Sequence, residues 1–302
     1  MADHLPEDRL RGMALVAVAV LVFALMDSTT KHLATSWNVP LVVAARYIGN
    51  LAFVLIVFLP RDGLALFRTQ RTTLVIIRAG SLGFASLFAG LAFQRMPVAE
   101  ATSIIYLAPI GVTLLAGYLL GEHVALTNWL AVAIGFCGVL LITRPGSGLD
   151  PFGAFFALLT AGSTISYFLL SRVLAKTETT EAMMLWCGVV GTVMFGVTLP
   201  WTFYGPIPGT IDTGLFIVIG GLALIGHFLF TAAYRYAPAS ALAPVNYLHL
   251  GWAGLLGWLV FGHVPDAYTA LGIAMVALAG AGAALYAHLT SNPPRALARK
   301  GA

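Results

Sequence analysis

Long apolar runs separated by short polar segments dominate this chain of 302 residues. Each run is close to the ~20 residues that a helix needs to cross the hydrocarbon core of a bilayer. The runs are continuous, whereas the strands of a membrane β-barrel alternate apolar and polar positions. The pattern therefore predicts an all-α polytopic membrane protein with ten transmembrane helices, at residues 11–31, 40–59, 74–94, 97–121, 127–144, 152–174, 182–201, 212–236, 239–262 and 266–288.

The composition supports a membrane location, because 59% of the residues are hydrophobic and only 9% are charged. Soluble domains contain about 25% charged residues. The net charge of +4 does not indicate a nucleic-acid partner, since the basic residues lie in short segments between the runs. Cys137 and Cys187 both fall inside apolar runs, so we expect no disulfide, no metal site and no cofactor.

The distribution of Lys and Arg predicts the orientation in the membrane. If residues 1–10 form a cytoplasmic tail, twelve basic residues lie on the inner side and three lie outside, while Arg46 lies within a span. We therefore expect both termini, including the polar tail 289–302, to face the cytoplasm, and we expect the first run to be a retained helix and not a cleavable signal peptide. The inner residues are Arg9, Arg11, Arg61, Arg68, Arg71, Arg78, Arg172, Lys176, Arg235, Arg295, Arg299 and Lys300, and the outer ones are Lys31, Arg95 and Arg144.

The two halves of the sequence resemble each other at a constant offset of 141 residues, the difference between Gly153 and Gly12. The match is clearest near residue 97. There Pro97 pairs with Pro238, Tyr106-Leu107 with Tyr247-Leu248, and Gly121 with Gly262. Because each half holds five predicted helices, an odd number, the halves at 11–147 and 148–288 are expected to be inverted repeats. Such repeats typically bind solute near the midplane and permit alternating access.

Several of these segments resemble the EamA-type members of the drug/metabolite transporter superfamily. The resemblance covers nearly the whole chain and rests on Phe23-Ala24-Leu25-Met26-Asp27 through Lys31, Arg46, Pro97-Val98-Ala99-Glu100-Ala101, Gly121-Glu122 with Trp129, and Gly135 to Gly138. The chain departs from the pattern in its second half, where Gly262-His263 stands in place of Gly121-Glu122. The resemblance implies a secondary transporter of the bacterial inner membrane. The solute could be an amino acid, a nucleoside-like compound, a vitamin or an amine, and the Met26-Asp27 to Lys31 pattern also resembles S-adenosylmethionine carriers.

Charged side chains inside spans are functional candidates because they are costly to place in hydrocarbon. Asp27 and Lys31 are four residues apart and share a helix face, and Arg46 lies at a similar depth on the next helix. These residues could form a charged gate or bind a solute carboxylate. Alternatively, Asp27 and Arg46 form a structural ion pair, and Lys31 extends to the membrane interface.

The predicted eighth and ninth helices carry more hydrogen-bonding groups than their counterparts in the first half. His227, Thr231 and Tyr234 form one stripe, and Asn246 and His249 share a face. An asymmetric solute requires an asymmetric site, so we predict that these residues bind it. The alternative is hydrogen bonding between helices, worth about 0.6–2 kcal/mol.

Aromatic residues in the middle of spans complete the predicted site. Tyr106 lies beside Ser103, Tyr167 lies in the sixth span, and Trp252 could form an apolar wall. Aromatic rings around a cavity bind planar or cationic groups, although such residues more often pack against neighbouring helices.

Three functional classes remain open from the sequence. A secondary carrier would couple transport to an exchanged solute or to protons carried by Asp27, His227 and His249. A membrane-embedded enzyme acting on lipids would need a nucleophile, base or metal cluster, but no phosphate-binding loop, His-Glu-x-x-His or Gly-x-Ser-x-Gly motif occurs. A channel would show flux without saturation. We expect a carrier, not an enzyme.

Overall fold

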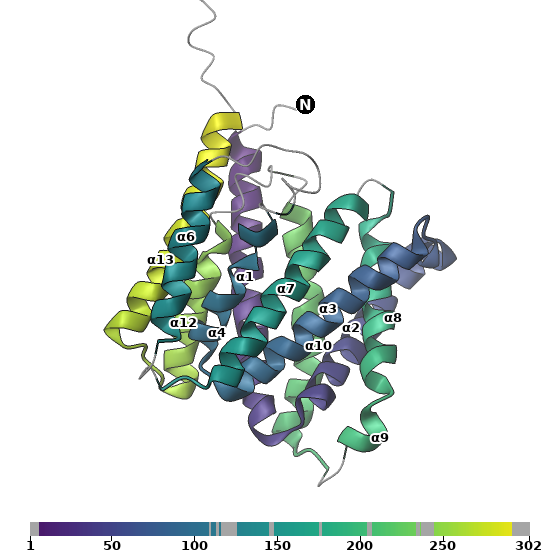
Figure 1. The fold of residues 1–302 in the computed structure, drawn as a ribbon. Coiled ribbons are helices and arrows are strands. Elements are labelled where there is room, and N and C mark those ends of the chain that lie inside the picture. Colours follow the sequence, from purple (N-terminus) through teal and green to yellow (C-terminus); the bar gives the residue numbers. More distant parts are fainter. Residues whose placement is uncertain are drawn as a thin grey trace, which may run out of the picture.

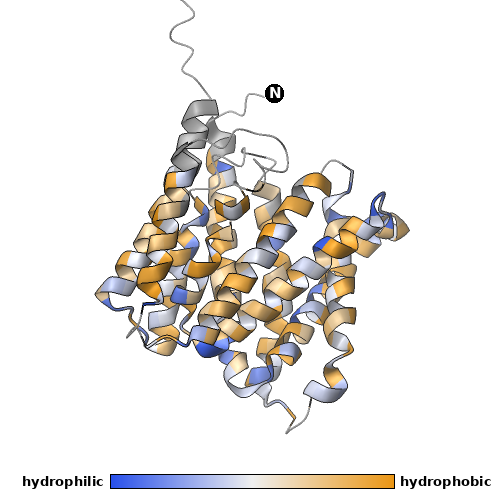
Figure 2. Cartoon of the chain, in the orientation of Figure 1, coloured by the Kyte–Doolittle hydropathy of each residue, from blue (hydrophilic) through white to orange (hydrophobic). Residues whose placement is uncertain are grey.

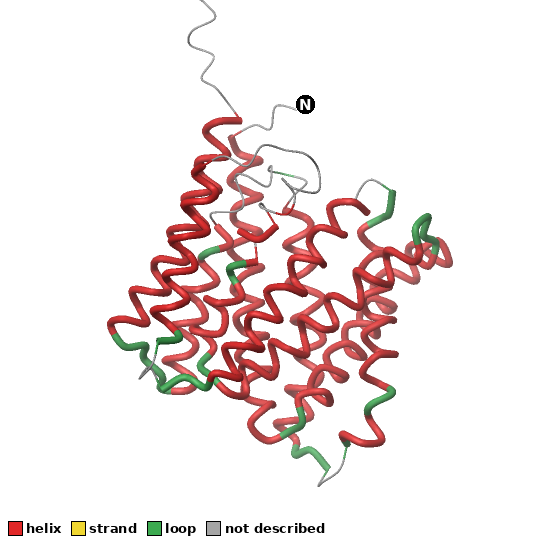
Figure 3. The backbone as a smooth tube through the Cα atoms, viewed as in Figure 1, coloured by secondary structure: helices red, strands yellow, loops and turns green. Residues whose placement is uncertain are grey.

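The computed structural model describes residues 6–108, 110–112, 115, 126–144, 148–174, 177–203, 207–233, 236 and 245–291. These residues form helices and loops only (Figure 3), as the sequence predicts. The helices are α1 Pro6–Ser36, α2 Val39–Asp62, η1 Gly63–Phe67, α3 Thr72–Arg95, α4 Val98–Ile105, α6 Leu126–Ile142, α7 Pro151–Leu174, α8 Thr180–Gly196, α9 Leu199–Thr202, α10 Thr210–Ala233, α12 Leu248–Phe261 and α13 Ala267–Ser291.

Five of these helical segments are long and apolar enough to cross a membrane, and shorter apolar helices lie between them. The long segments are Leu10–Ser36, Val39–Phe67, Thr72–Arg95, Pro151–Ser171 and Thr210–Phe230. Hydrophobic residues run along most of the helices, and hydrophilic residues gather near the loops (Figure 2). The chain is therefore a multi-pass membrane protein, while the count of ten spans stays a prediction.

Large apolar side chains point outward as well as inward. Ile56, Trp201 and Leu278 are 69%, 71% and 71% exposed, although a water-soluble protein would bury residues of this kind. A lipid environment accounts for this outward surface, because hydrocarbon makes no demand for polar side chains.

The bundle has two regions that meet along α1, α3 and α7 (Figure 1). In one region α6 packs along α13, and α4 packs against α12 and α7. In the other, α2 packs against both α8 and α10. α1 contacts α10 and α12, and α3 contacts α7 and α8, so these helices join the two regions.

Glycine pairs permit the closest helix crossings. A β-carbon on Gly220 of α10 would lie 2.7 Å from the backbone of Gly49 on α2. A β-carbon on Gly138 of α6 would lie 2.7 Å from the carbonyl oxygen of Gly272 on α13. Small residues at such contacts let helix backbones approach closely in a membrane.

The fourth predicted span is not one continuous helix. α4 ends at Ile105, and Tyr106 and Leu107 form a turn before helical residues resume at Ala108. Proline at position 109 explains the break, because it has no N–H to donate to the carbonyl of Ile105 four residues earlier. A similar turn at Tyr247 precedes α12, so the predicted ninth span is also interrupted.

Candidate substrate-binding site

A first group of polar and aromatic side chains lies where α1, α4 and α12 meet. It consists of Asp27, Tyr106, Asn246, Tyr247 and His249, and we refer to it as the Tyr106 cluster. The Tyr106 ring lies 5.4 Å from the Tyr247 ring and 5.5 Å from the His249 ring, measured between centroids. The Tyr106 hydroxyl donates a hydrogen bond of 3.1 Å to the backbone carbonyl of Asn246. These contacts bring together Tyr106, Asn246 and His249, three of the residues that the sequence predicts for the site.

Two polar atoms of the Tyr106 cluster are buried and form no hydrogen bond with a described residue. They are Asn246 Oδ1 and His249 Nε2. Asp27 Oδ2 lies 3.4 Å from His249 Nε2 but does not form a hydrogen bond with it. Because buried polar atoms almost always have hydrogen-bond partners, these two atoms are suited to bind a polar ligand.

The two interrupted spans explain how these residues come together. Tyr106 follows the end of α4, and Tyr247 precedes the start of α12. Non-helical backbone at membrane depth is tolerated only where protein covers it or where it lines a cavity. The turns thus place backbone polar groups and aromatic rings at the same point inside the bundle.

A second group lies among α2, α3, α7 and α8. It consists of Arg46, Tyr47, Arg78, Tyr167 and Cys187, and we refer to it as the arginine cluster. Arg78 is 7% exposed and lies over the Tyr167 ring, 4.4 Å from its centroid. Its guanidinium donates to Tyr167 Oη at 2.9 Å, to Ser171 Oγ at 2.6 Å and to Cys187 Sγ at 3.2 Å.

Arg46 differs from Arg78 in having no hydrogen bond to any described residue. Its guanidinium lies 5.6 Å from the centroid of the Tyr47 ring, and its Nε is buried without a partner. The charge of Arg46 acts through space on Asp27 of the Tyr106 cluster and on Tyr167 of its own cluster. No ion pair within 4.0 Å joins Asp27 to Arg46, although the sequence left that pairing open.

Other predicted site residues lie apart from the two clusters. The Ser103 hydroxyl is fully buried and donates to the Ala99 carbonyl of its own helix at 2.6 Å. Trp252 packs against an apolar group that includes Val16 and Ala233.

The predicted stripe on α10 is described only in part. The His227 ring contacts the Phe23 ring edge-on, with a centroid distance of 5.0 Å. Arg46 and Arg78 both act on His227 through space, which places it near the arginine cluster. Tyr234 and the side chain of Thr231 lie outside the described residues.

Sequence reasoning missed Arg78, Tyr47 and Tyr247. Arg78 was counted only as a cytoplasmic-side charge, although its position within the third apolar run indicated burial. Tyr47 follows Arg46 directly, and its hydroxyl shares a hydrogen bond of 2.8 Å with Ser86 Oγ. Tyr247 was identified as the repeat counterpart of Tyr106, and that relation could have predicted its place.

A third polar group lies at the end of the bundle away from the N-terminus. It consists of Lys31, Glu100, Arg144, His263 and Asp266, and we refer to it as the far-end network. Lys31 Nζ donates to the Phe93 and Met96 carbonyls at 2.8 and 2.9 Å, rather than pairing with Asp27. Glu100, 2% exposed, binds His263 Nε2 through Oε1 at 2.7 Å. Arg144 forms an ion pair with Asp266.

Two carboxyl groups outside the spans have lowered pKa values. The pKa of Asp266 falls from 3.8 to about 2, because the Thr269 N–H and the Arg144 guanidinium donate to the ionised form. The pKa of Asp150 is lowered mainly by a hydrogen bond from Arg95, at 2.8 Å. Both groups therefore stay ionised at neutral pH and connect loops at this end.

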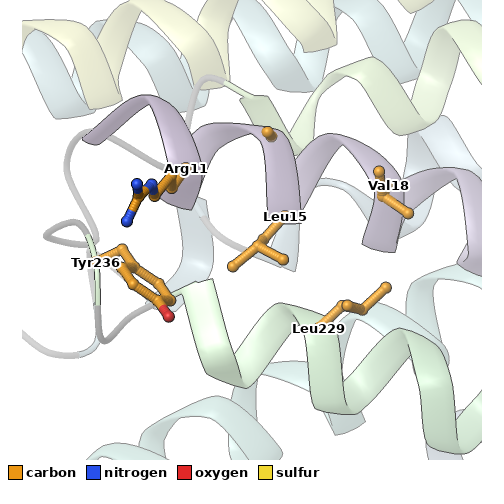
Figure 4. A pocket seen from close by; sticks show the side chains of 6 residues that line it. Arg11, Leu15, Val18, Leu229 and Tyr236 are labelled. Carbon is orange, nitrogen blue, oxygen red and sulfur yellow. The ribbon is translucent and has the colours of Figure 1, made fainter. Parts of the chain in front are cut away.

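A separate open groove lies between α1 and α10, near the N-terminal end of α1. Arg11 and Tyr236 stand at one end of it, and Leu15, Val18 and Leu229 line it (Figure 4). Its volume is about 390 Å³. Its lining includes none of the predicted site residues.

The sequence is similar to several curated bacterial transporters. It is 31% identical to a riboflavin transporter of Rhizobium johnstonii, over 90% of each chain. It is 26% identical to a pseudopaline exporter of Pseudomonas aeruginosa, over 89% of this chain and 94% of the relative. It is 24% identical to an S-adenosylmethionine uptake transporter of Rickettsia prowazekii, over 88% and 90%.

The fold and a family model agree with these similarities. A crystal structure with 19% sequence identity superposes with a TM-score of 0.66 and covers 93% of this chain and 98% of its own. The model of the EamA-like transporter family matches residues 10–144. Together with the relative that is 31% identical over 90% of the chain, this match shows that the protein belongs to the EamA-like transporter family.

Proposed function

We propose that the protein is a secondary active carrier that moves a small organic metabolite across the bacterial cytoplasmic membrane by alternating access. Its site lies between the halves 11–147 and 148–288 and comprises the Tyr106 cluster and the neighbouring Arg46. The observation that carries this proposal is that Asn246 Oδ1 and His249 Nε2 are buried without a hydrogen bond, next to Tyr106 and with Asp27 Oδ2 3.4 Å from His249 Nε2.

The packing of helices supports two inverted halves. The offset of the sequence repeat relates α1 to α7, α2 to α8, α3 to α10 and α6 to α13. Exchanging these partners converts the α1–α10 contact into α7–α3, and the α2–α10 contact into α8–α3. Both of the converted contacts occur. A two-fold relation of this kind is the usual basis of alternating access.

The chemistry of the Tyr106 cluster favours a planar solute with N–H groups. The Tyr106 and Tyr247 rings provide aromatic surface, on which planar rings stack. Asn246 Oδ1 and the Asp27 carboxylate accept hydrogen bonds, and both lie near those rings. Riboflavin is therefore the first solute to test, with S-adenosylmethionine and nucleosides next, in line with the named substrates of two relatives.

Orientation and coupling form part of the same proposal. The bias of basic residues favours cytoplasmic termini, which puts the far-end network on the outer side. Asp27, His227 and His249 are the candidate proton carriers, since they are titratable groups placed within the bundle. If none of them carries protons, Asp27→Asn, His227→Ala and His249→Ala will leave the pH dependence of uptake unchanged.

Transport into proteoliposomes tests the carrier function. We expect saturable riboflavin uptake and counterflow, in which unlabelled riboflavin inside the vesicles accelerates entry of labelled riboflavin. His249→Leu should lower uptake at least about tenfold, because a site loses affinity when a buried hydrogen-bonding group is removed. His32→Leu, the same change at an exposed position of α1, is the matched control.

Two results would contradict the proposal. Flux that neither saturates nor shows counterflow would indicate a channel. Equal uptake by the His249→Leu and His32→Leu proteins would remove the Tyr106 cluster from the site.

A further inference from the structure

We infer that the site prefers a solute that carries an anionic group, a carboxylate or a phosphate, over its neutral analogue, and that Arg46 binds this group. The inference rests on the proposed function and narrows the class of solute. Its basis is that two arginines in the interior of the bundle, Arg46 and Arg78, have no described carboxylate within 4.0 Å.

Arg46 has unused capacity to bind an anion. A guanidinium carries five N–H donors in a planar fork that matches a carboxylate or a phosphate. Among the described residues none accepts a hydrogen bond from Arg46, and its only close contact with a polar residue is the face of the Tyr47 ring. Arg46 as a whole is half-buried, and its Nε is fully buried.

The charges around Arg46 do not cancel. Arg78 lies nearby, and all of its hydrogen bonds go to neutral groups, namely Ser171, Cys187, Tyr167 and the Met183 carbonyl. No described carboxylate lies within 4.0 Å of either guanidinium, and Asp27 is the acidic group that acts on Arg46 through space. The buried Arg78 and the half-buried Arg46, near a single acidic group, leave a positive field, and a charge in the bundle interior is unfavourable unless a partner compensates it.

The two arginines have different roles in this arrangement. Arg78 is held by four partners and is a positioning residue that keeps the Tyr167 ring in place and adds to the positive field. Arg46 is the residue free to change partners. Because its charge reaches Asp27 and Tyr167, a solute ring in the Tyr106 cluster could extend an acidic substituent to Arg46.

Matched pairs of solutes test the inference directly. Each pair shares a ring and differs by one anionic group: riboflavin and riboflavin 5′-phosphate, adenosine and adenosine 5′-phosphate, tryptamine and tryptophan. Thermal-shift titration of the purified full chain gives an apparent affinity for each member. In at least one pair we expect the anionic member to bind at least about tenfold more tightly, as a charge-assisted hydrogen bond allows. The phosphate and carboxylate pairs distinguish the two anions.

Substitutions assign the preference to a residue. In Arg46→Gln the affinity ratio of the pair should fall to about one, and Arg46→Lys should restore part of it, because it keeps the charge but loses the fork. Arg95→Gln is the matched control, since Arg95 pairs with Asp150 outside the clusters. In Arg95→Gln the affinity ratio of the anionic to the neutral solute should equal that of the unsubstituted protein.

The outcomes separate this inference from the carrier function. If the unsubstituted protein prefers no anionic member, or if Arg46→Gln keeps the preference, the inference is wrong, whether or not transport occurs. Because the first of these comparisons uses the unsubstituted protein, it decides even if Arg46→Gln fails to fold. Conversely, Arg46-dependent binding of an anionic solute without saturable flux into vesicles would contradict the carrier function and leave the inference intact.

Discussion

Polar side chains in the far-end network and in the Tyr106 cluster are satisfied to very different degrees. Lys31 binds two carbonyl groups, Arg144 pairs with Asp266, and His263 binds Glu100. In the Tyr106 cluster, Asn246 Oδ1 and His249 Nε2 form no hydrogen bond with a described residue, although both atoms are buried.

We interpret this difference as one between groups that stabilise the fold and groups that bind the solute. Satisfied networks contribute to stability, and removing one member lowers it. Unsatisfied buried groups lower the stability of the protein without ligand, and in the proposed function those of the Tyr106 cluster bind the solute. The Oε2 atom of Glu100 is an exception at the far end, because it is buried without a partner.

The largest expected effect comes from comparing two asparagines. Asn246→Leu should lower uptake at least about tenfold, because the site loses its hydrogen-bonding group, and should leave the melting temperature unchanged or higher. Asn38→Leu should lower the melting temperature and keep uptake, since Asn38 donates to the Thr202 carbonyl at 3.0 Å. Vesicle uptake and thermal unfolding of both proteins check this. If Asn246→Leu and Asn38→Leu change uptake and melting temperature in the same way, the two asparagines do not differ in role.

The next effect concerns Lys31. Lys31→Met removes two hydrogen bonds to the end of α3 and should lower the free energy of unfolding by about 2 kcal/mol, as expected for bonds to a charged group. Uptake per folded molecule should stay within about twofold, because Lys31 is placed outside both clusters. Reversible unfolding in mixed micelles measures the first quantity. A large loss of uptake at unchanged stability would assign Lys31 to the transport cycle.

A smaller effect is expected at the Glu100–His263 contact. Glu100→Gln keeps an acceptor for His263 but removes a buried charge, so the two changes oppose each other and stability should shift by less than about 1 kcal/mol. Thermal unfolding measures the shift, with Glu181→Gln as a control of the same type on α8. Loss of uptake in Glu100→Gln alone would mean that the far-end network takes part in transport.

The fold was largely predictable from the sequence, and the pairing of side chains was not. Apolar runs located the membrane helices, because helix length and hydrophobicity suffice for that purpose. The turn at Tyr106 could have been placed from Pro109, which removes a backbone donor. However, the partner of Lys31 is a pair of carbonyls 62 and 65 residues away in the chain, and helix packing alone determines that contact.

The candidate site shows the same limit. Tyr106, Asn246 and His249 were predicted from their polarity within apolar runs, and the structure brings them together. Arg78 was missed because a basic residue seven positions into α3 was assigned to the membrane interface. A sequence does not distinguish a side chain that extends to the interface from one that is buried against Tyr167.

The smallest effect concerns Asp266 and appears only in acid. Since the pKa of Asp266 falls from 3.8 to about 2 on folding, its contribution to stability is present above about pH 3.8 and is lost as the pH falls towards 2. Asp266→Asn should therefore lower the melting temperature slightly at neutral pH and flatten its decline between pH 4 and pH 2. Thermal unfolding across this range, compared with Asp212→Asn, checks the sign. If the melting temperature of Asp266→Asn declines as steeply as that of the unsubstituted protein, the ion pair with Arg144 does not stabilise the far-end network. A hydrogen-bonded polar group in that network would then not by itself indicate a structural role.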